Sequence, residues 1–284
     1  MKILIADSGS TKTEWILVNG SDEKKRFYCD GLNPFFMTLS NMKSTILEGV
    51  VNALGEISID KIFFYGSGCG SVKGKNLVKE AITDCFPTAE IFVETDLLGA
   101  AKACFFQSAG MACILGTGSN SCLYDGHKVS DSIPSLGFTL GDEGSGGYFG
   151  KELIRSYYYK TMPENLRNKL SKEYDMDLEK ILENVYKKPN ANRYVASFSQ
   201  FLGDHHEHPF IKTVVENGFR DFAEKQLTYY KEIEGMNVGF VGSIAAFHQD
   251  ILENVLRSYS LNLSIIVRKP LDRLVEYHLQ SELN

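Results

Sequence analysis

The chain has 284 residues, a formal net charge of -6, a hydrophobic fraction of 43% and a charged fraction of 23%. These values are ordinary for a globular protein and leave room for two domains. The acidic balance disfavours a nucleic-acid-binding protein, and no run approaches the roughly 20 apolar residues that span a bilayer. The first residues lack the basic and apolar segments of a secretion signal, so we expect a cytoplasmic protein without membrane or nucleic-acid partners.

The first half of the chain alternates predicted strands and helices. A run of apolar residues predicts strands over 3–6 and 15–18, on either side of a turn, and a third strand over 26–29. Further along, the pattern predicts a helix over 42–54, a strand over 61–65, a helix over 75–85, a strand over 90–94 and a helix over 97–106. This alternation is typical of a layered α/β domain.

The second half begins with another pair of apolar strands around a turn. Predicted elements follow in this order: strands 112–115 and 122–124, a glycine-rich loop 137–147, helices from about 148 to 234, a strand 238–241, a helix 244–257, a strand 264–267, and a helix opened by Pro270. Because the strand-turn-strand pattern restarts near residue 111, we expect one domain over 1–110 and another over 111–269. The last helix, 270–284, is assigned to the first domain.

The two turns between apolar strands carry similar chemistry. Asp7-Ser8-Gly9-Ser10-Thr11-Lys12-Thr13 forms the first, and Gly116-Thr117-Gly118-Ser119-Asn120-Ser121 forms the second. Glycine, serine and threonine in such turns leave backbone N–H groups and hydroxyls free to bind an anion. We therefore expect two phosphate clamps for one nucleotide, with Lys12 adding a positive charge and Asp7 holding Mg²⁺ through water.

Asp96 follows a predicted strand and opens a helix. Its carboxylate could accept the proton of a substrate hydroxyl as that hydroxyl attacks a γ-phosphorus. Equally, Thr95-Asp96 could serve only to cap the helix. Spacing alone leaves both possibilities open.

Other motifs point to chemistry less clearly. Gly66 and Gly68 follow a strand but lack the third glycine of a dinucleotide fingerprint, and neither Thr11-Lys12-Thr13 nor Gly74-Lys75 completes a Walker A loop. The run His205-His206-Glu207-His208-Pro209 lacks metal-site spacing, so we expect a solvated loop between helices. The six cysteines form no C-x-x-C pair and are expected to be structural thiols: Cys29, Cys69, Cys85, Cys104, Cys113 and Cys122.

Four motifs in series resemble those of a known family. They are the first turn, Gly116-Thr117-Gly118-Ser119-Asn120, Gly141-Asp142-Glu143-Gly144-Ser145 and Val241-Gly242-Ser243-Ile244. In this order they resemble the N-acetylglucosamine kinases, which belong with the BadF/BadG-type ATPases in the superfamily of sugar kinases, Hsp70 and actin. The resemblance implies an α/β fold of two ribonuclease-H-like (actin-like ATPase) domains, with ATP and sugar in the cleft between them. It also suggests a homodimer.

The resemblance implies roles for individual residues. The ATP site would contain Gly9, Ser10, Thr11, Lys12, Thr117, Gly118, Gly242 and Ser243. The sugar site would contain Asn33, Asp96, Ser119, Asn120, Gly137 and Asp142. Asp96 matches the family's catalytic base, which favours that role over helix capping. Asp142 has an alternative role, fastening the glycine-rich loop through backbone N–H groups.

The function implied is an ATP- and Mg²⁺-dependent kinase that phosphorylates N-acetylglucosamine at its 6-hydroxyl. N-acetylmuramic acid, glucosamine and N-acetylmannosamine remain open as substrates, because Pro34-Phe35-Phe36 departs from the family after Asn33. Ser8 and Ser10 replace two glycines of the family's first turn, which serine allows unless positive φ is required. The alternatives are an ATPase activator of a 2-hydroxyacyl-CoA dehydratase or reductase type of enzyme, and a non-catalytic sugar sensor.

Overall fold

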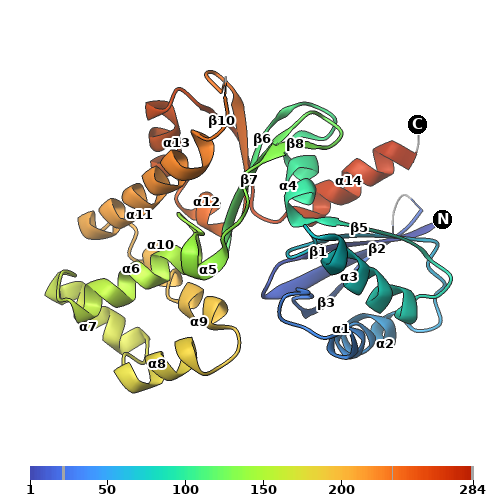
Figure 1. The fold of residues 1–284 in the computed structure, drawn as a ribbon, viewed down its shortest axis with the longest axis horizontal. Coiled ribbons are helices and arrows are strands. Elements are labelled where there is room, and N and C mark those ends of the chain that lie inside the picture. Colours follow the sequence, from blue (N-terminus) through green and yellow to red (C-terminus); the bar gives the residue numbers. More distant parts are fainter. Residues whose placement is uncertain (21–22, 232, 283–284) are drawn as a thin grey trace. The chain divides into compact units, whose positions relative to one another are not determined.

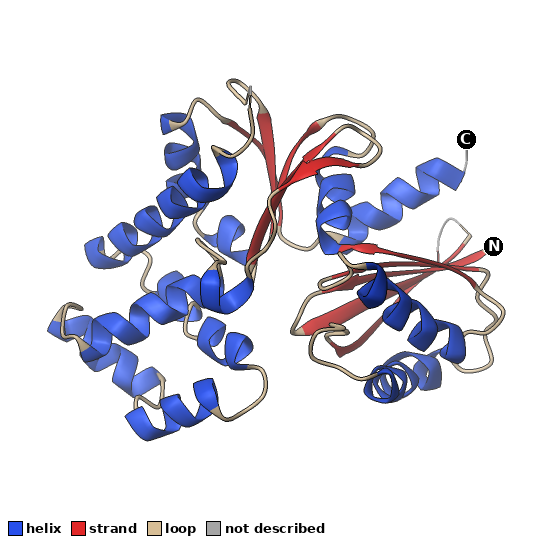
Figure 2. Cartoon of the chain, in the orientation of Figure 1, coloured by secondary structure: helices blue, strands red, loops and turns tan. Residues whose placement is uncertain are grey.

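The computed structural model describes residues 1–20, 23–231 and 233–282. These residues form a mixed α/β protein with two five-stranded sheets (Figures 1 and 2), so the expected α/β fold class is confirmed. The chain divides into two compact units. Unit 1 contains Met1–Ala109, Asp125–Val129 and the segment from Lys269 onward, and unit 2 contains Gly110–Tyr124 and Ser130–Arg268.

The sheet of unit 1 has the strand order β3-β2-β1-β4-β5. Its strands are β1 (Lys2–Ser8), β2 (Lys12–Asn19), β3 (Glu23–Asp30), β4 (Lys61–Gly66) and β5 (Glu90–Thr95). The first three strands pair antiparallel, whereas β4 and β5 run parallel to β1. Because parallel strands end at the same edge, the segments that follow β1, β4 and β5 meet there. Asp7 thus lies level with Tyr65 on β4 and Glu14 on β2.

Helices cover both faces of this sheet (Figure 1). They are α1 (Leu39–Ile46), α2 (Asn52–Leu54), α3 (Val72–Cys85), α4 (Asp96–Phe105) and α14 (Leu271–Glu282), with a π-helical segment, Leu47–Val51, between α1 and α2. The two-residue period of β1 decides which side chains meet which helices. Leu4 and Ala6 belong to the core with α1 and α3, whereas Ile3 and Ile5 pack with α4 and α14.

The sheet of unit 2 has the same plan as that of unit 1. Its order is β10-β9-β6-β7-β8, and its strands are β6 (Gly110–Leu115), β7 (Ser119–Tyr124), β8 (Val129–Ser132), β9 (Asn237–Val241) and β10 (Asn262–Val267). β6 and β7 form an antiparallel hairpin, and β9 and β10 run parallel to β6. The restart of the pattern in the sequence therefore corresponds to a repeated sheet topology.

Unit 2 is rich in helices, which Figure 2 draws in blue like those of unit 1. They are α5 (Gly137–Leu140), α6 (Gly146–Tyr158), α7 (Glu164–Glu173), α8 (Leu178–Tyr186), α9 (Ala191–Ser197), α10 (Gln200–Asp204), α11 (Pro209–Phe222), α12 (Ser243–Phe247) and α13 (Gln249–Ser258), with a π-helical segment, Ala223–Leu227. The helical region expected after residue 148 is confirmed. Its core contains buried aromatic residues, among them Phe149, Phe219 and Phe240.

Several expectations about local structure need correction. The predicted helix 42–54 contains a π-helical segment, Leu47–Val51, whose turn is wider than that of an α-helix. Helical spacing in the sequence places Leu47 on the apolar face, but its side chain is 43% exposed in the structure. The predicted helix 244–257 breaks at His248, which separates α12 from α13. The predicted loop 137–147 contains the short helix α5. Strand β8 carries little apolar pattern and was not expected from the sequence.

The histidine-rich run is a loop between α10 and α11, as expected. His208 caps α11, because its Nδ1 accepts a hydrogen bond from the N–H of Phe210 at 3.1 Å. His205 lies 3.0 Å from a carboxylate oxygen of Glu173. Within the described ranges, no helix is both long and apolar enough to span a bilayer.

Candidate functional site

The first predicted clamp is the tight turn that joins β1 and β2. The N–H of Gly9 donates to the carbonyl of Lys12 at 3.0 Å, and Ser8 pairs with Thr13 at the end of the ladder. Neither Ser8 nor Ser10 is among the described residues with positive φ. Serine is therefore compatible with the turn at both positions where the family usually has glycine.

Ser8 points into the protein. Its side chain is buried, its Oγ lies 2.8 Å from Oγ1 of Thr13, and it accepts a hydrogen bond from the N–H of Leu32 at 3.1 Å. The loop after β3 is tied to the turn a second time, because the N–H of Gly31 donates to the carbonyl of Thr11 at 3.2 Å. The hydroxyl of Ser8 thus joins the turn between β1 and β2 to the loop that carries Asn33.

Asn33 lies beside the first clamp. Its side chain is buried, and its Nδ2 donates to Ser10 Oγ at 3.2 Å and to Ser67 Oγ at 3.4 Å. Gly68 allows this approach, since a Cβ there would lie 2.5 Å from Asn33 Oδ1, and its φ is +83°. Neither Ser67 nor Gly68 was among the predicted site residues. The signal that could have found them is the cluster of glycines directly after a buried strand parallel to β1.

The carboxylates of Asp7 and Asp96 lie at the same edge of the unit 1 sheet. Burial raises the pKa of Asp7 to about 7, and the nearby carboxylates of Asp96 and Glu14 add to the effect. Burial also raises the pKa of Asp96 to about 6, although hydrogen bonds from the N–H groups of Leu97 and Asp96 and from the hydroxyl of Ser67 oppose the shift. Such values suit groups that exchange protons near neutral pH.

The helix cap at α4 is Thr95 rather than Asp96. Thr95 Oγ1 accepts a hydrogen bond from the N–H of Leu98 at 3.1 Å, and Asp96 is the first helical residue. One oxygen of Asp96 accepts from the N–H of Leu97 at 2.9 Å. Capping is thus performed by the neighbouring residue, Thr95, and is not the role of the Asp96 side chain.

Lys12 brings a positive charge to the edge of the first clamp. The residue is exposed, and its ammonium lies 3.8 Å from the centre of the Tyr28 ring, a cation–π contact. The charge of Glu14 is paired with Arg26 at 2.6 Å. No group of three or more His, Cys, Asp or Glu residues in the described chain could hold a metal. Asp7 and Asp96 could still hold Mg²⁺, because this ion keeps several waters and binds phosphate oxygens.

The second clamp lies at the start of α6 in unit 2. The N–H of Gly116 donates to the carbonyl of Gly118 at 3.0 Å, and the carbonyl of Thr117 accepts from the N–H of Gly147 at 3.0 Å. Gly242 lies against the same strand end, because a Cβ there would be 2.2 Å from the carbonyl oxygen of Leu115. The structure therefore brings Thr117, Gly118, Gly242 and Ser243 to one edge of this sheet.

Three predicted sugar-binding residues of unit 2 lie at the second clamp: Ser119 and Asn120 belong to it, and Asp142 contacts it. Asp142 Oδ1 accepts a hydrogen bond from the N–H of Ser119 at 3.3 Å, so the carboxylate fastens the glycine-rich loop to the first residue of β7. Burial raises the pKa of Asp142. Asn120 Oδ1 accepts from the N–H of Ser121 at 2.9 Å, and a Cβ at Gly137 would meet nothing within 4 Å.

The hydroxyl of Ser119 is a buried polar group that could bind a ligand in unit 2. Its side chain is only 4% exposed, yet its Oγ has no hydrogen-bond partner among the described residues. A buried hydroxyl without a partner costs about 1–3 kcal/mol of stability. A polar ligand that bonds to this oxygen would recover that free energy.

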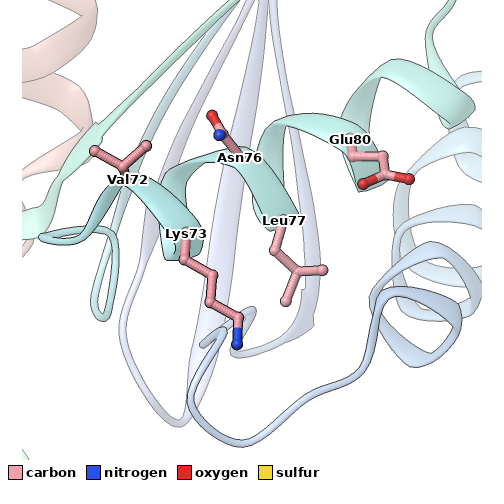
Figure 3. A pocket seen from close by; sticks show the side chains of 5 residues that line it. All are labelled: Val72, Lys73, Asn76, Leu77 and Glu80. Atoms are coloured by element: carbon pink, nitrogen blue, oxygen red, sulfur yellow. The ribbon is translucent and has the colours of Figure 1, made fainter.

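A hollow on α3 does not belong to the candidate site. Five residues line it, all from α3 (Figure 3): Val72, Lys73, Asn76, Leu77 and Glu80. Their polar ends point in different directions and converge on no common point. The candidate site therefore rests on the strand ends and turns of each unit.

Comparisons with known proteins place the chain among sugar kinases. No family model matches it, and no curated protein does. A solved structure from Porphyromonas gingivalis, provisionally assigned as an N-acetylglucosamine kinase, is 36% identical, covers 99% of both chains and superposes with a TM-score of 0.93. A second structure with the same provisional assignment, from Chromobacterium violaceum, is 15% identical over 97% of this chain and 98% of that chain, with a TM-score of 0.75.

The fold extends to more distant kinases. A ROK family glucokinase from Streptomyces griseus, solved with glucose and AMPPNP, has a TM-score of 0.60 and 13% identity over 100% of both chains. At 13% identity, this similarity is evidence for a common fold alone. The similarity to the Porphyromonas gingivalis protein covers 99% of both chains, and an identity of 36% over that length shows membership of one family. The chain therefore belongs to the N-acetylglucosamine kinase family, whose fold is that of the sugar kinases and actin-like ATPases.

Proposed function

We propose that this chain is an ATP-dependent kinase that phosphorylates an N-acetylated amino sugar, with N-acetylglucosamine at its 6-hydroxyl as the leading substrate. The main support for this proposal is the set of polar side chains at one edge of the unit 1 sheet. There, two carboxylates with raised pKa values, Asp7 and Asp96, lie beside a glycine- and serine-rich turn and the amide of Asn33. Phosphoryl transfer requires such an arrangement of a base, a cation-binding carboxylate and anion-binding donors.

Asp96 is the proposed catalytic base. The sugar oxygen attacks the γ-phosphorus, the bond between that phosphorus and the β–γ bridging oxygen breaks, and ADP leaves with the electron pair. The hydroxyl proton passes to the carboxylate of Asp96. A pKa of about 6 leaves this carboxylate mostly ionised at neutral pH while keeping it a useful proton acceptor.

The nucleotide is assigned to the two clamps. In unit 1, the proposed phosphate contacts come from Gly9, Ser10, Thr11 and Lys12. In unit 2, they come from Thr117 and Gly118, with Gly242 and Ser243 at the adenosine. Mg²⁺ held through Asp7 would supply charge neutralisation for the β- and γ-phosphate oxygens. Burial, together with the nearby carboxylates of Asp96 and Glu14, raises the pKa of Asp7, and this concentration of negative charge supports a cation at this position.

The sugar is assigned to polar groups at the same turns. Asn33 supports one part of the proposed site, and Ser119, Asn120, Gly137 and Asp142 support the other. The free, buried hydroxyl of Ser119 is the strongest support in unit 2, because it lacks a partner within the described protein. The choice among amino sugars rests on the family alone.

The ATPase-activator alternative is not favoured. An iron–sulfur cluster between two subunits would require accessible cysteine thiolates at the site. Cys69 lies in the loop after β4 but is buried, and burial raises the pKa of its thiol to about 12. This cysteine is therefore a poor candidate for a cluster ligand.

The test is ADP release from ATP and Mg²⁺ with each of a panel of sugars. The panel contains N-acetylglucosamine, N-acetylmannosamine, N-acetylmuramic acid and glucosamine, with glucose as the matched control lacking the amino group. We expect turnover that depends on one N-acetylated sugar, and a 6-phosphate as the product. ADP release that is independent of every sugar would contradict a kinase and support the ATPase alternative.

A further inference from the structure

The short helix α5, which we call the α5 turn, is tied to a lysine of the next helix in unit 2. Lys151 of α6 donates a hydrogen bond from its ammonium to the carbonyl oxygen of Phe138 at 2.7 Å. The same ammonium lies 5.1 Å from the centre of the Phe138 ring, a cation–π contact. One side chain of α6 thus binds both the backbone and the ring of a residue that directly follows Gly137.

The ring of Phe138 also packs on the backbone of α6. A Cβ at Gly147 would lie 3.4 Å from an atom of this ring, so the ring and the helix are in close contact there. Gly147 and Lys151 are four residues apart and therefore share one face of the helix. The absence of a side chain at Gly147 admits the ring, and Lys151 contacts it one helical turn later.

The leucines at either end of the α5 turn do not anchor it. Leu136 is 65% exposed and Leu140 is 73% exposed, so neither side chain belongs to the core. Within the described residues, Lys151 provides the one side-chain hydrogen bond to Gly137–Leu140. Since a hydrogen bond from a charged donor is stronger than a neutral one, this contact is the main polar anchor of the turn.

Helix α6 provides a fixed base for this lysine. Phe149 and Leu153 are fully buried in the core of unit 2, which holds the helix against the rest of the unit. At the start of α6, the N–H of Gly147 donates to the carbonyl of Thr117 in the second clamp at 3.0 Å. The backbone of Lys151 is therefore fixed relative to the second clamp.

The segment 137–142 is held at its other end by Asp142. One oxygen of Asp142 accepts a hydrogen bond from the N–H of Ser119 at 3.3 Å, and the residue has a φ of +61°. This left-handed conformation is uncommon for a residue other than glycine and persists where the surroundings hold it. Burial raises the pKa of Asp142, whereas the hydrogen bond from Ser119 and the positive charge of Lys151 oppose the rise. Lys151 thus acts on both ends of the segment.

We infer that Lys151 is a positioning residue for sugar binding, whose ammonium fixes the α5 turn and with it the proposed sugar-binding residues Gly137 and Asp142. The inference rests on the proposed function and adds to it a residue outside the set that the family resemblance implies.

The test is sugar phosphorylation by Lys151→Met, Lys151→Arg and the unchanged enzyme. Methionine keeps an unbranched side chain but cannot donate, so the KM for N-acetylglucosamine should rise about tenfold. The KM for ATP should change by less than about twofold, because the α5 turn carries no proposed nucleotide-binding residue. Lys151→Arg keeps a charged donor and should restore most of the affinity for the sugar.

Arg155→Met is the matched control. It removes the same charge from α6 one turn later, where Arg155 pairs with Glu152 rather than with the α5 turn. The KM for N-acetylglucosamine should therefore stay within about twofold of the original value. An unchanged KM for the sugar in folded Lys151→Met, or a value in Lys151→Arg as high as that in Lys151→Met, would overturn the inference.

Hydrogen exchange in the protein without ligands provides a measurement that is independent of turnover. The N–H of Gly141 donates to the carbonyl of Gly137 at 2.8 Å, so its exchange reports on the order of the α5 turn. In Lys151→Met it should exchange about tenfold faster, whereas the amide of Leu153 in α6 should not change. Unchanged exchange at Gly141 would overturn the inference even if the protein is a sugar kinase. Faster exchange in a protein that phosphorylates no sugar would contradict the proposed function while supporting the anchoring of the turn by Lys151.

Discussion

Gly31→Ala tests whether close packing of the Asn33 loop on the first clamp is needed for activity. A Cβ at Gly31 would lie 2.3 Å from the carbonyl oxygen of Gly9 and 2.6 Å from the carbonyl carbon and oxygen of Ser10. All of these are backbone atoms and cannot turn aside as a side chain can. Ordinary contact begins at 3.4 Å, so the loop must retreat by about 1 Å.

A displacement of this size should separate Asn33 from Ser10 and weaken positioning of the sugar. Misplacement by 1 Å costs up to about 100-fold in rate, or about 2.7 kcal/mol of transition-state stabilisation. We therefore expect kcat/KM for the sugar to fall by about two orders of magnitude. Overpacking should also lower the free energy of unfolding by about 1–3 kcal/mol.

The assay is steady-state kinetics with the sugar and with ATP varied in turn. Gly70→Ala is the control, because it lies in another loop of unit 1 and a Cβ there meets nothing within 4 Å. Trp15 is the single tryptophan and is buried in the core of unit 1, so its fluorescence reports whether that unit stays folded. Activity of folded Gly31→Ala equal to that of Gly70→Ala would refute the reasoning.

Three further predictions concern the same edge of unit 1. If Asp96 must be ionised to act as the base, kcat should fall about tenfold per pH unit below about pH 6, and a kcat independent of pH from 5 to 8 would exclude this role. Burial raises the folded-state pKa of Asp7 to about 7 from 3.8, so stability is lost as pH rises from about 4 to 7. At pH 8, urea unfolding of Asp7→Asn should therefore give a free energy of unfolding about 4 kcal/mol higher than that of the unchanged protein. That advantage should shrink toward pH 4, and the same difference at both pH values, followed by Trp15 fluorescence, would contradict the cause. Ser8→Ala leaves the N–H of Leu32 with only its 3.3 Å hydrogen bond to Thr13 Oγ1. The free energy of unfolding should therefore fall by about 1–2 kcal/mol, and hydrogen exchange at the Leu32 amide should become faster. An unchanged exchange rate would show that the hydrogen bond to Ser8 does not contribute to stability.

Much of the site could be predicted because its residues stand at the ends of apolar strands. Asp7 directly precedes a turn between two such strands, and Asp96 directly follows another, so both carboxylates were placed at strand ends from the sequence. In the structure, β1 and β5 both flank β4 and run parallel to it, which brings these two ends to one edge. The hydrophobic pattern thus contained the information needed to place the two proposed catalytic groups.

The contacts that order the site could not be predicted in the same way. Ser8 bonds to Leu32, 24 positions away, and Asn33 bonds to Ser67, 34 positions away. Such pairs leave no periodic signal, because each depends on how strands and loops stack after folding. The π-helical segment Leu47–Val51 could not be predicted either, because no change in amino-acid composition marks the point at which the helical turn widens.

The sequence alone could not decide whether Thr95 or Asp96 caps α4. Threonine and aspartate are both good caps, and the sequence did not say which of the neighbours starts the helix. In the structure, the hydroxyl of Thr95 takes the N–H of Leu98, and Asp96 becomes the first helical residue. Only the backbone path at the end of β5 decides between them.

The most direct test of the proposed kinase chemistry is Asp96→Asn, measured for sugar-dependent ADP release and for nucleotide affinity in the same preparation. Removing the base should lower kcat by about 10²–10⁴-fold. The dissociation constant for ATP should change by less than about twofold, since the proposed phosphate contacts lie in the turns. Turnover close to that of the unchanged enzyme, or a parallel loss of ATP affinity, would contradict the assignment of Asp96 as the base that activates the sugar hydroxyl.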